Sequence, residues 1–205
     1  MQYELTMRID PQALRRIHEM DMGLTLVKSV VSSLPAHLPV AWVQFQPLEV
    51  NQVTWTEACS IYATETPLQP GETIVQISEA PAQPGWVYIF NEGGLEGEPA
   101  NLGEVCKVVN GRQGPFAFGL AQQATIGGNP MLAPLNAVTV PFNETVNFTP
   151  KETVSICLAP LTSNGVVLSR VPGNALTLSL TAQAPTAVIG FNDESNTFYL
   201  ISRGE

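Results

Sequence analysis

The chain has 205 residues, of which only 13% are charged, and a length that is compatible with one all-β domain spanning residues 1–205. Its formal net charge is −9, and the whole acidic excess lies in residues 29–106, which contain nine glutamates and no Lys or Arg. Such a block repels phosphates and anionic headgroups, so it excludes nucleic acids and acidic membranes as partners.

The N-terminal segment predicts a strand followed by a helix. Tyr3, Leu5, Met7 and Ile9 alternate with polar residues, as on a strand with one buried face. Asp10-Pro11 then supplies an N-cap and a proline at the first helical position, which predicts a helix over 11–21 that ends at Gly23. A strand over 24–31 and a proline-rich connector over 34–39 follow.

The rest of the chain predicts strands separated by turns. We expect strands at 40–46, 53–64, 73–78, 86–90, 105–109, 116–126, 137–142, 145–148, 153–158, 166–171, 175–181, 187–191 and 197–201. Residues 91–104 are expected to form the longest loop, and Asn110-Gly111 a hairpin turn. The predicted fold is therefore an all-β, antiparallel sandwich of about a dozen strands with one short N-terminal helix.

The three cysteines, Cys59, Cys106 and Cys157, all lie in apolar, strand-like runs. We expect them to be buried, reduced thiols, and the alternative is one disulfide with a free thiol.

Targeting signals are weak in this sequence. No apolar run is long enough to span a membrane, and the N-terminal segment lacks the apolar stretch of a secretory signal. The expected location is cytoplasmic, with release by lysis or a non-classical route as the alternative. The sequons at Asn143 and Asn147 would matter only in a secreted protein.

No motif of an enzyme class is present, so we predict a non-enzymatic protein without a cofactor. The two histidines, His18 and His37, are interpreted as a helix residue and a connector residue. A Cys59–His37 pair stays open, but no Gly-x-Ser-x-Gly elbow accompanies it. A hydrolase is a further alternative, because glycoside hydrolysis needs two carboxylates that face one cleft. The candidate carboxylates are Glu49, Glu57, Glu65 and Glu72.

The sequence predicts no metal centre. The cysteines and histidines are too widely spaced for zinc. Two acidic turns are weak candidates for calcium binding through oxygen ligands. The first contains Glu92, Glu96 and Glu98, and the second contains Asp193, Glu194, Ser195 and Asn196. Solvated turns are the simpler interpretation of both.

Aromatic residues gather in the segment that lacks basic residues. The candidate ligand-binding residues are Trp42, Trp55, Tyr62, Trp86 and Tyr88, with Phe45 and Phe90 in the same region. They indicate either core packing between sheets or an exposed platform that stacks on sugar rings or holds a choline headgroup. Which of the two applies depends on the direction in which each ring points.

The stretch from Trp42 to Trp55, WVQFQPLEVNQVTW, resembles a hairpin of a β-sandwich. The general plan is similar to that of small β-sandwich lectins and cytolysins of fungi and bacteria, many of which are acidic. The resemblance is one of architecture, and no family motif matches residue by residue.

Three hypotheses for the function follow. The first is a lectin- or cytolysin-like recognition protein for a neutral glycan or a zwitterionic lipid headgroup. The second is a self-assembling structural protein whose partner is itself, through sheet edges, so a homo-oligomer is expected. The third is the hydrolase with dispersed carboxylates.

Overall fold

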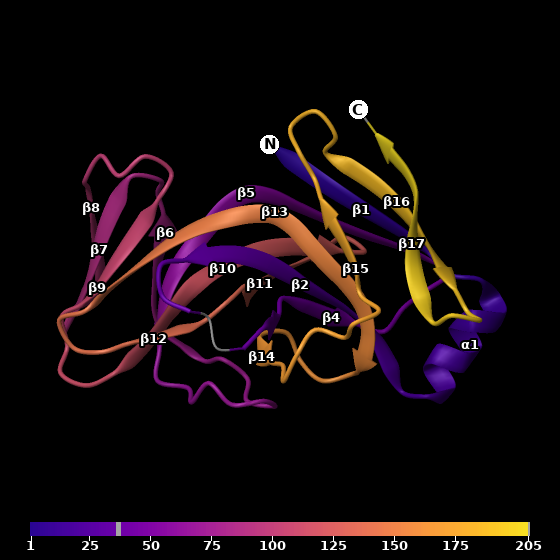
Figure 1. The fold of residues 1–205 in the computed structure, drawn as a ribbon, viewed down its shortest axis with the longest axis horizontal. Helices are drawn as coiled ribbons and strands as arrows, with labels where there is room; N and C mark the ends of the chain where they lie inside the picture. Colours follow the sequence, from indigo (N-terminus) through magenta and orange to yellow (C-terminus); the bar gives the residue numbers. More distant parts are fainter. Residues whose placement is uncertain (36–37, 205) are drawn as a thin grey trace.

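The computed structural model describes residues 1–35 and 38–204 (Figure 1). They form a mostly-β protein with 17 strands and one short N-terminal helix, which confirms the predicted fold class. Strands β5 (Val50–Thr64), β10 (Phe116–Ile126) and β13 (Thr145–Pro160) curve strongly across the middle of the molecule (Figure 1). The prediction of one domain over 1–205 stays a prediction.

The start of the chain follows its sequence pattern closely. Strand β1 (Gln2–Arg8) leads into helix α1 (Pro11–Glu19), where the Asp10 carboxylate accepts a hydrogen bond from the Gln12 N–H at 2.8 Å. The helix ends two residues earlier than predicted because Asp21 adopts the left-handed conformation, with φ 53°. A hydrogen bond of 2.9 Å between His18 Nε2 and the Pro47 carbonyl fixes the helix to the connection between residues 45 and 50, which is distant in the sequence.

The first large sheet has eight strands. Its order is β11-β10-β5-β1-β16-β17, while β12 also pairs with β10 and β6 with β5. The bounds are β5 Val50–Thr64, β6 Gln76–Ala82, β10 Phe116–Ile126, β11 Asn129–Pro134, β12 Val138–Val140, β16 Thr186–Asn192 and β17 Thr197–Gly204.

The second large sheet has seven strands in the order β4-β2-β13-β9-β7-β8, and β15 also pairs with β13. The bounds are β2 Met22–Ser32, β4 Val43–Phe45, β7 Trp86–Asn91, β8 Gly94–Pro99, β9 Cys106–Asn110, β13 Thr145–Pro160 and β15 Leu176–Ser179. A two-stranded sheet joins β3 (Val40–Ala41) to β14 (Val166–Val167).

The two large sheets are mixed, not purely antiparallel. Strand β1 pairs in parallel with β16, and β7 pairs in parallel with β9. The second pairing arises because β8 folds back on one side of β7 and the chain then returns to place β9 on the other side. Polar and apolar residues alternate in the same way in parallel and in antiparallel strands. The sequence pattern therefore could not reveal the two parallel pairings.

A cluster of buried residues fills the space between the two large sheets. The first sheet contributes residues such as Leu5, Met7 and Val53, and the second contributes Leu26 and Phe148, all at most 1% exposed. Alternation along each strand directs these side chains to a common interior, as predicted for a sandwich.

Two local predictions are wrong. The expected loop 91–104 contains β8, which forms a tight hairpin with β7 because Gly94 adopts φ 103° at the turn. Asn110-Gly111 does not form a hairpin, since β9 and β10 lie in different sheets. Instead the buried Asn110 amide donates to the carbonyls of Gly114 and Val140, both at 2.9 Å.

All three cysteines are free thiols, as expected, and Cys106 and Cys157 are buried while Cys59 is partly buried. Burial raises the pKa of Cys59 to about 12 and that of both Cys106 and Cys157 to about 11. The thiols are therefore protonated near neutral pH. Within the described residues, no helix has the length and apolar character needed to cross a membrane.

The close approach of Gly119 to its neighbours gives a stability prediction. A Cβ atom at this residue of β10 would lie 1.9 Å from the Asn136 carbonyl oxygen, so Gly119→Ala forces the backbone apart. We expect the free energy of unfolding to fall by about 3 kcal/mol, measured by urea denaturation. Gly173→Ala, where nothing lies within 4 Å, is the control and should change it by less than about 0.5 kcal/mol. Equal effects of the two variants would contradict this prediction.

Candidate functional site

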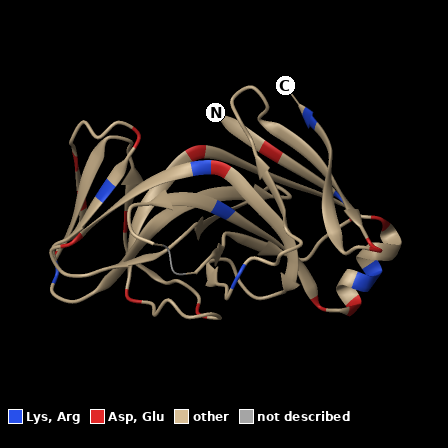
Figure 2. Ribbon diagram, viewed as in Figure 1, with Lys and Arg blue, Asp and Glu red and all other residues tan. Residues whose placement is uncertain are grey.

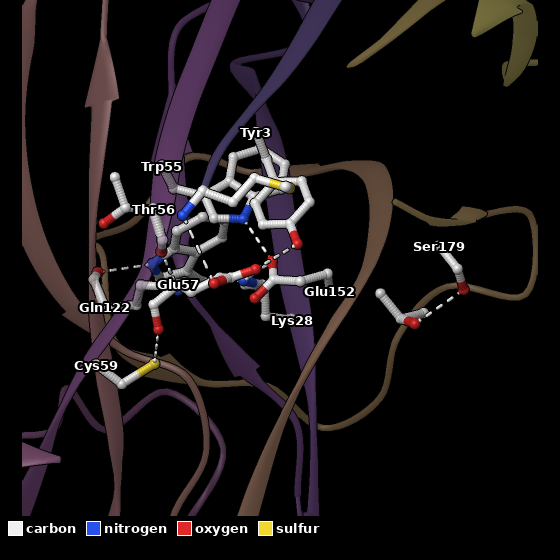
Figure 3. A network of polar contacts seen from close by, with 12 residues as sticks. Tyr3, Lys28, Trp55, Thr56, Glu57, Cys59, Gln122, Glu152 and Ser179 are labelled. Carbon is white, nitrogen blue, oxygen red and sulfur yellow. Dashed lines mark hydrogen bonds and ion pairs between the residues drawn. The ribbon is translucent and has the colours of Figure 1, made fainter. Parts of the chain in front are cut away.

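A buried lysine lies between the two large sheets. Lys28 projects from β2 with a side chain that is 0% exposed. Its Nζ donates hydrogen bonds to Glu152 Oε2 on β13 and to Gln122 Oε1 on β10, each at 2.6 Å (Figure 3). A charge that is fully removed from water requires such partners, because its desolvation is costly.

Two indole rings complete the surroundings of this ammonium group. Lys28 Nζ lies 5.2 Å from the ring centroid of Trp42 and 5.1 Å from that of Trp55, within the range of cation–π attraction. The two rings meet edge to face at 5.4 Å. Burial lowers the pKa of Lys28 below its ordinary value, and the Glu152 carboxylate opposes that shift.

The side chains around Lys28 satisfy one another's polar atoms. The Gln122 side chain donates from Nε2 to the Thr56 backbone carbonyl at 2.6 Å, and the backbone carbonyl of Gln122 accepts a hydrogen bond from Trp42 Nε1 at 2.9 Å. Trp55 Nε1 donates to Glu152 Oε2 at 2.6 Å. The network therefore links β2 and β13 of one sheet to β5 and β10 of the other (Figure 3).

Irregular strand pairing occurs on both sheets beside this network. On β13 the pairing with β2 shifts between Pro150 and Val154, so Glu152 lies in a bulge opposite Ser29. On β5 the three residues 56–58, with Glu57 in the middle, lie opposite the single residue Gln123. Bulges bend a strand and redirect its side chains, and they are common beside functional sites.

The redirected carboxylates line one hollow, which we call the acidic hollow. Its volume is about 320 Å³, and it is lined by Glu57, Pro84, Glu104, Thr149, Pro150 and Glu152. Glu57 accepts a hydrogen bond from the Tyr3 hydroxyl at 2.9 Å, and the terminal amino group lies 3.6 Å from its other oxygen. Burial, with a further contribution from Glu57, raises the pKa of Tyr3 to about 12.

A second hollow, which we call the Trp86 hollow, adjoins the first. It measures about 370 Å³ and is lined by Pro84, Gly85, Trp86, Pro99, Asn101 and Gly103. Pro84 belongs to both hollows, and Gly103 of one is the chain neighbour of Glu104 of the other. The two hollows are therefore adjacent, with an indole in one and carboxylates in the other.

Backbone hydrogen bonds hold the loops around the Trp86 hollow together. Gly85 donates to the Val105 carbonyl at 3.0 Å and accepts from the Ala100 and Leu102 N–H groups at 2.9 and 3.3 Å. Gly85 adopts φ 84°, a conformation that favours glycine. The walls of this hollow are thus fixed before any ligand arrives.

Four of the five predicted aromatic residues lie in the core. Trp42, Trp55, Tyr62 and Tyr88 are at most 3% exposed. Their polar atoms have partners inside the protein: Tyr62 donates to the Asn136 carbonyl and Tyr88 to the Pro81 carbonyl. Of the two interpretations left open by the sequence, core packing therefore applies to these four rings. Only Trp86 remains half-buried.

The weak calcium candidates do not come together. Glu92 lies on the β7–β8 turn beside Arg112 at 3.6 Å, while Glu96 is on β8. Asp193 forms an ion pair with Arg16 at 2.5 Å in the distant β16–β17 turn, which also contains Asn196. In residues 1–35 and 38–204, no group of three or more His, Cys, Asp or Glu could hold a metal ion.

The sequence candidates for catalysis are also dispersed. His37 lies outside the described residues, so its pairing with Cys59 stays untested, and His18 belongs to the helix contact with Pro47. Of the four candidate glutamates, Glu57 is the one that lines the acidic hollow.

Sequence reasoning missed Lys28, Glu104 and Glu152. One signal was available for Lys28, since it is a single cation within the apolar strand LTLVKSVV, and a buried charge requires a partner. Nothing in the sequence identifies Glu152 as that partner, because the two residues are far apart in the chain and meet through sheet pairing.

Comparison of the chain with protein-family models, with curated proteins and with solved structures gave no match.

The ion pair gives an asymmetric stability prediction. Glu152→Gln leaves the Lys28 charge enclosed without a counter-ion and should lower the free energy of unfolding by about 3–5 kcal/mol. Lys28→Met should lower it less, because the 15% exposed Glu152 can turn toward water. The measurement is urea denaturation of each variant and of the double variant, whose loss should be smaller than the sum.

Glu92→Gln removes a carboxylate that is 90% exposed in its pair with Arg112, and it is the control, with an expected change below about 0.5 kcal/mol. Additive effects at Lys28 and Glu152 would contradict a coupled buried pair.

Proposed function

We propose that the protein is a non-enzymatic recognition protein that binds a neutral glycan across the acidic hollow and the Trp86 hollow. The observation that carries this proposal is that the two hollows are adjacent and share Pro84 in their linings. Ligand sites commonly combine a concave, partly apolar surface with a few fixed polar groups, and volumes near 300 Å³ or more are typical.

The chemistry at the two ends is that required for a sugar. The half-buried Trp86 offers an aromatic surface for the C–H face of a ring. Carboxylates accept hydrogen bonds from hydroxyl groups, and charged acceptors form the stronger ones. Glu152 uses Oε2 for both Lys28 and Trp55, and among the described residues its Oε1 has no partner.

The charges favour a neutral glycan over a zwitterionic lipid. Neither hollow has Lys or Arg in its lining, so the phosphate of a lipid headgroup would face Glu57, Glu104 and Glu152 without a counter-ion. Figure 2 shows that acidic residues are spread over strands and loops instead of forming one long stretch. The favoured ligand therefore donates hydrogen bonds and carries no negative charge.

Two substitutions test the site once a glycan array has identified a ligand. Trp86→Ala removes the aromatic surface and Glu104→Gln removes a charged acceptor, so each should weaken binding about ten-fold in titration calorimetry. Phe142→Ala, at an exposed aromatic residue outside both hollows, is the control and should bind normally.

Three outcomes would contradict the proposal. They are a blank glycan array, binding that survives both substitutions, and binding to phosphatidylcholine vesicles with no response to glycans. The last outcome would favour the lipid-binding alternative.

A second candidate function, self-association, is favoured by the edge strand β17. This strand ends the order of the eight-stranded sheet and carries Tyr199, Leu200 and Ile201, which are 48%, 40% and 51% exposed. Tyr199 and Leu200 are consecutive, regularly paired residues that point to opposite faces of the strand, so both faces are open. Unpaired backbone groups with apolar side chains are a template for pairing with a second copy.

If β17 mediates self-association, the protein should be a homo-oligomer by light scattering, and Leu200→Lys should shift it toward monomer. Leu48→Lys, at a 65% exposed loop residue, is the control and should leave the mass unchanged. A monomeric mass for the unsubstituted protein at all concentrations would exclude this candidate.

A further inference from the structure

A third hollow, which we call the polar hollow, opens on the outer face of the eight-stranded sheet. Its volume is about 310 Å³. Its lining includes Gln2 of β1, Thr54, Thr56 and Ala58 of β5, and Gln123 and Thr125 of β10. Strand pairing brings these residues together, because Gln2 lies opposite Thr56 and Thr54 lies opposite Thr125. They occupy outward positions, since the alternate residues of β5, Val53 and Trp55, are buried in the core.

The polar side chains of this hollow are accessible and not engaged within the protein. Gln2, Thr56 and Gln123 are exposed, while Thr54 and Thr125 are partly buried. Among the described residues, none of these five side chains has a hydrogen-bond partner. Elsewhere on the surface, outward hydroxyl groups on neighbouring strands pair with each other at 2.9 Å, as in β13 and β15. Because hydroxyl and amide groups both donate and accept, the hollow offers both functions to a ligand.

The lining of the polar hollow contains no charged residue. An anion would find no cation there, and a cation would find no carboxylate. A neutral ligand that carries several hydroxyl groups matches this lining best. The same ligand class is favoured by the charges of the acidic hollow and the Trp86 hollow.

One short segment of β5 separates the polar hollow from the acidic hollow. Trp55, Thr56 and Ala58 line the polar hollow, whereas Glu57 between them lines the acidic hollow. The Trp55 indole also donates to Glu152 of the acidic hollow at 2.6 Å (Figure 3). The Glu57 side chain is 56% exposed, so it stands at the boundary between the two hollows within reach of a ligand.

We propose that the polar hollow is a further subsite for the neutral glycan, which is therefore an oligosaccharide and not a single sugar. This inference rests on the proposed function, because one part of the ligand must occupy the acidic hollow and the Trp86 hollow. The following sugar units pass over Glu57 and place their hydroxyl groups against the threonines and glutamines. Each such hydrogen bond contributes modestly, so the subsite acts through several of them and binding depends on glycan length.

The test is NMR of the full chain with neutral glucans of two lengths, cellobiose with cellohexaose and maltose with maltohexaose. The Trp86 indole N–H reports on the Trp86 hollow, and the side-chain amides of Gln2 and Gln123 report on the polar hollow. A disaccharide should shift the Trp86 signal alone. The hexasaccharide of the same linkage should shift the signals of all three residues and bind about ten-fold more tightly.

Substitutions separate this subsite from the simple statistical advantage of a longer sugar. Gln123→Ala and Thr56→Val should each weaken hexasaccharide binding about five-fold and leave disaccharide binding unchanged. Gln52→Ala is the matched control, since Gln52 is an exposed glutamine of β5 outside the lining, and it should bind both sugars normally. Equal losses in Gln52→Ala and Gln123→Ala would contradict the subsite.

The reporters distinguish failure of this inference from failure of the proposed function. Unchanged Gln2 and Gln123 signals beside a responding Trp86 would overturn the inference and leave the proposed function intact. A response of the glutamines without Trp86 would also overturn it, because the ligand would not span both sites. No response to any of the four glucans would overturn it as well, and the glycan array then decides the proposed function separately.

Discussion

The polar network around the buried Lys28–Glu152 pair is the interaction on which the arrangement of the two large sheets depends, because its hydrogen bonds to Gln122 and Trp55 cross from one sheet to the other. Lys28 is fully enclosed, so it must keep Glu152 and Gln122 within hydrogen-bond distance. Sliding of one sheet over the other would leave the Lys28–Glu152 pair intact within its own sheet, but it would separate Lys28 from Gln122 and Glu152 from Trp55. Those buried polar groups would then lose their hydrogen bonds. An apolar core tolerates many packings of similar energy, whereas this network is satisfied in only one. Its main effect is therefore to fix the register between the sheets.

The same ion pair explains why the strands beside it are irregular. A regular β13 would direct its side chains alternately inward and outward, but Glu152 must reach Lys28 and Trp55 while remaining 15% exposed. The bulge between Pro150 and Val154 makes this possible, and a matching irregularity in β5 holds Glu57 on the facing sheet. Two departures from regular pairing thus bring carboxylates from different sheets to one hollow.

Local pattern was enough to predict the fold class but not the site. Asp10-Pro11 specified the start of the helix, and alternation such as that of Leu5 and Met7 located strands, because both depend on neighbouring residues. Aromatic content could not distinguish Trp42, which is buried, from Trp86, which is half-buried, since the inward face of a strand depends on its partners. Pairing across more than one hundred residues, as between Lys28 and Glu152, leaves no local signal.

The uneven charge of the sequence has a structural counterpart in the acidic hollow. Residues 29–106 supply Glu57 and Glu104 but no cation, so any compensation must come from outside the segment. Lys28 neutralises Glu152 from the interior, and the terminal amino group approaches Glu57, yet no such partner reaches Glu104 among the described residues. Negative charge is therefore left at the rim of the hollow, where it costs little in contact with water. Such a rim selects against anions and leaves acceptors free for a ligand that brings its own hydroxyl donors.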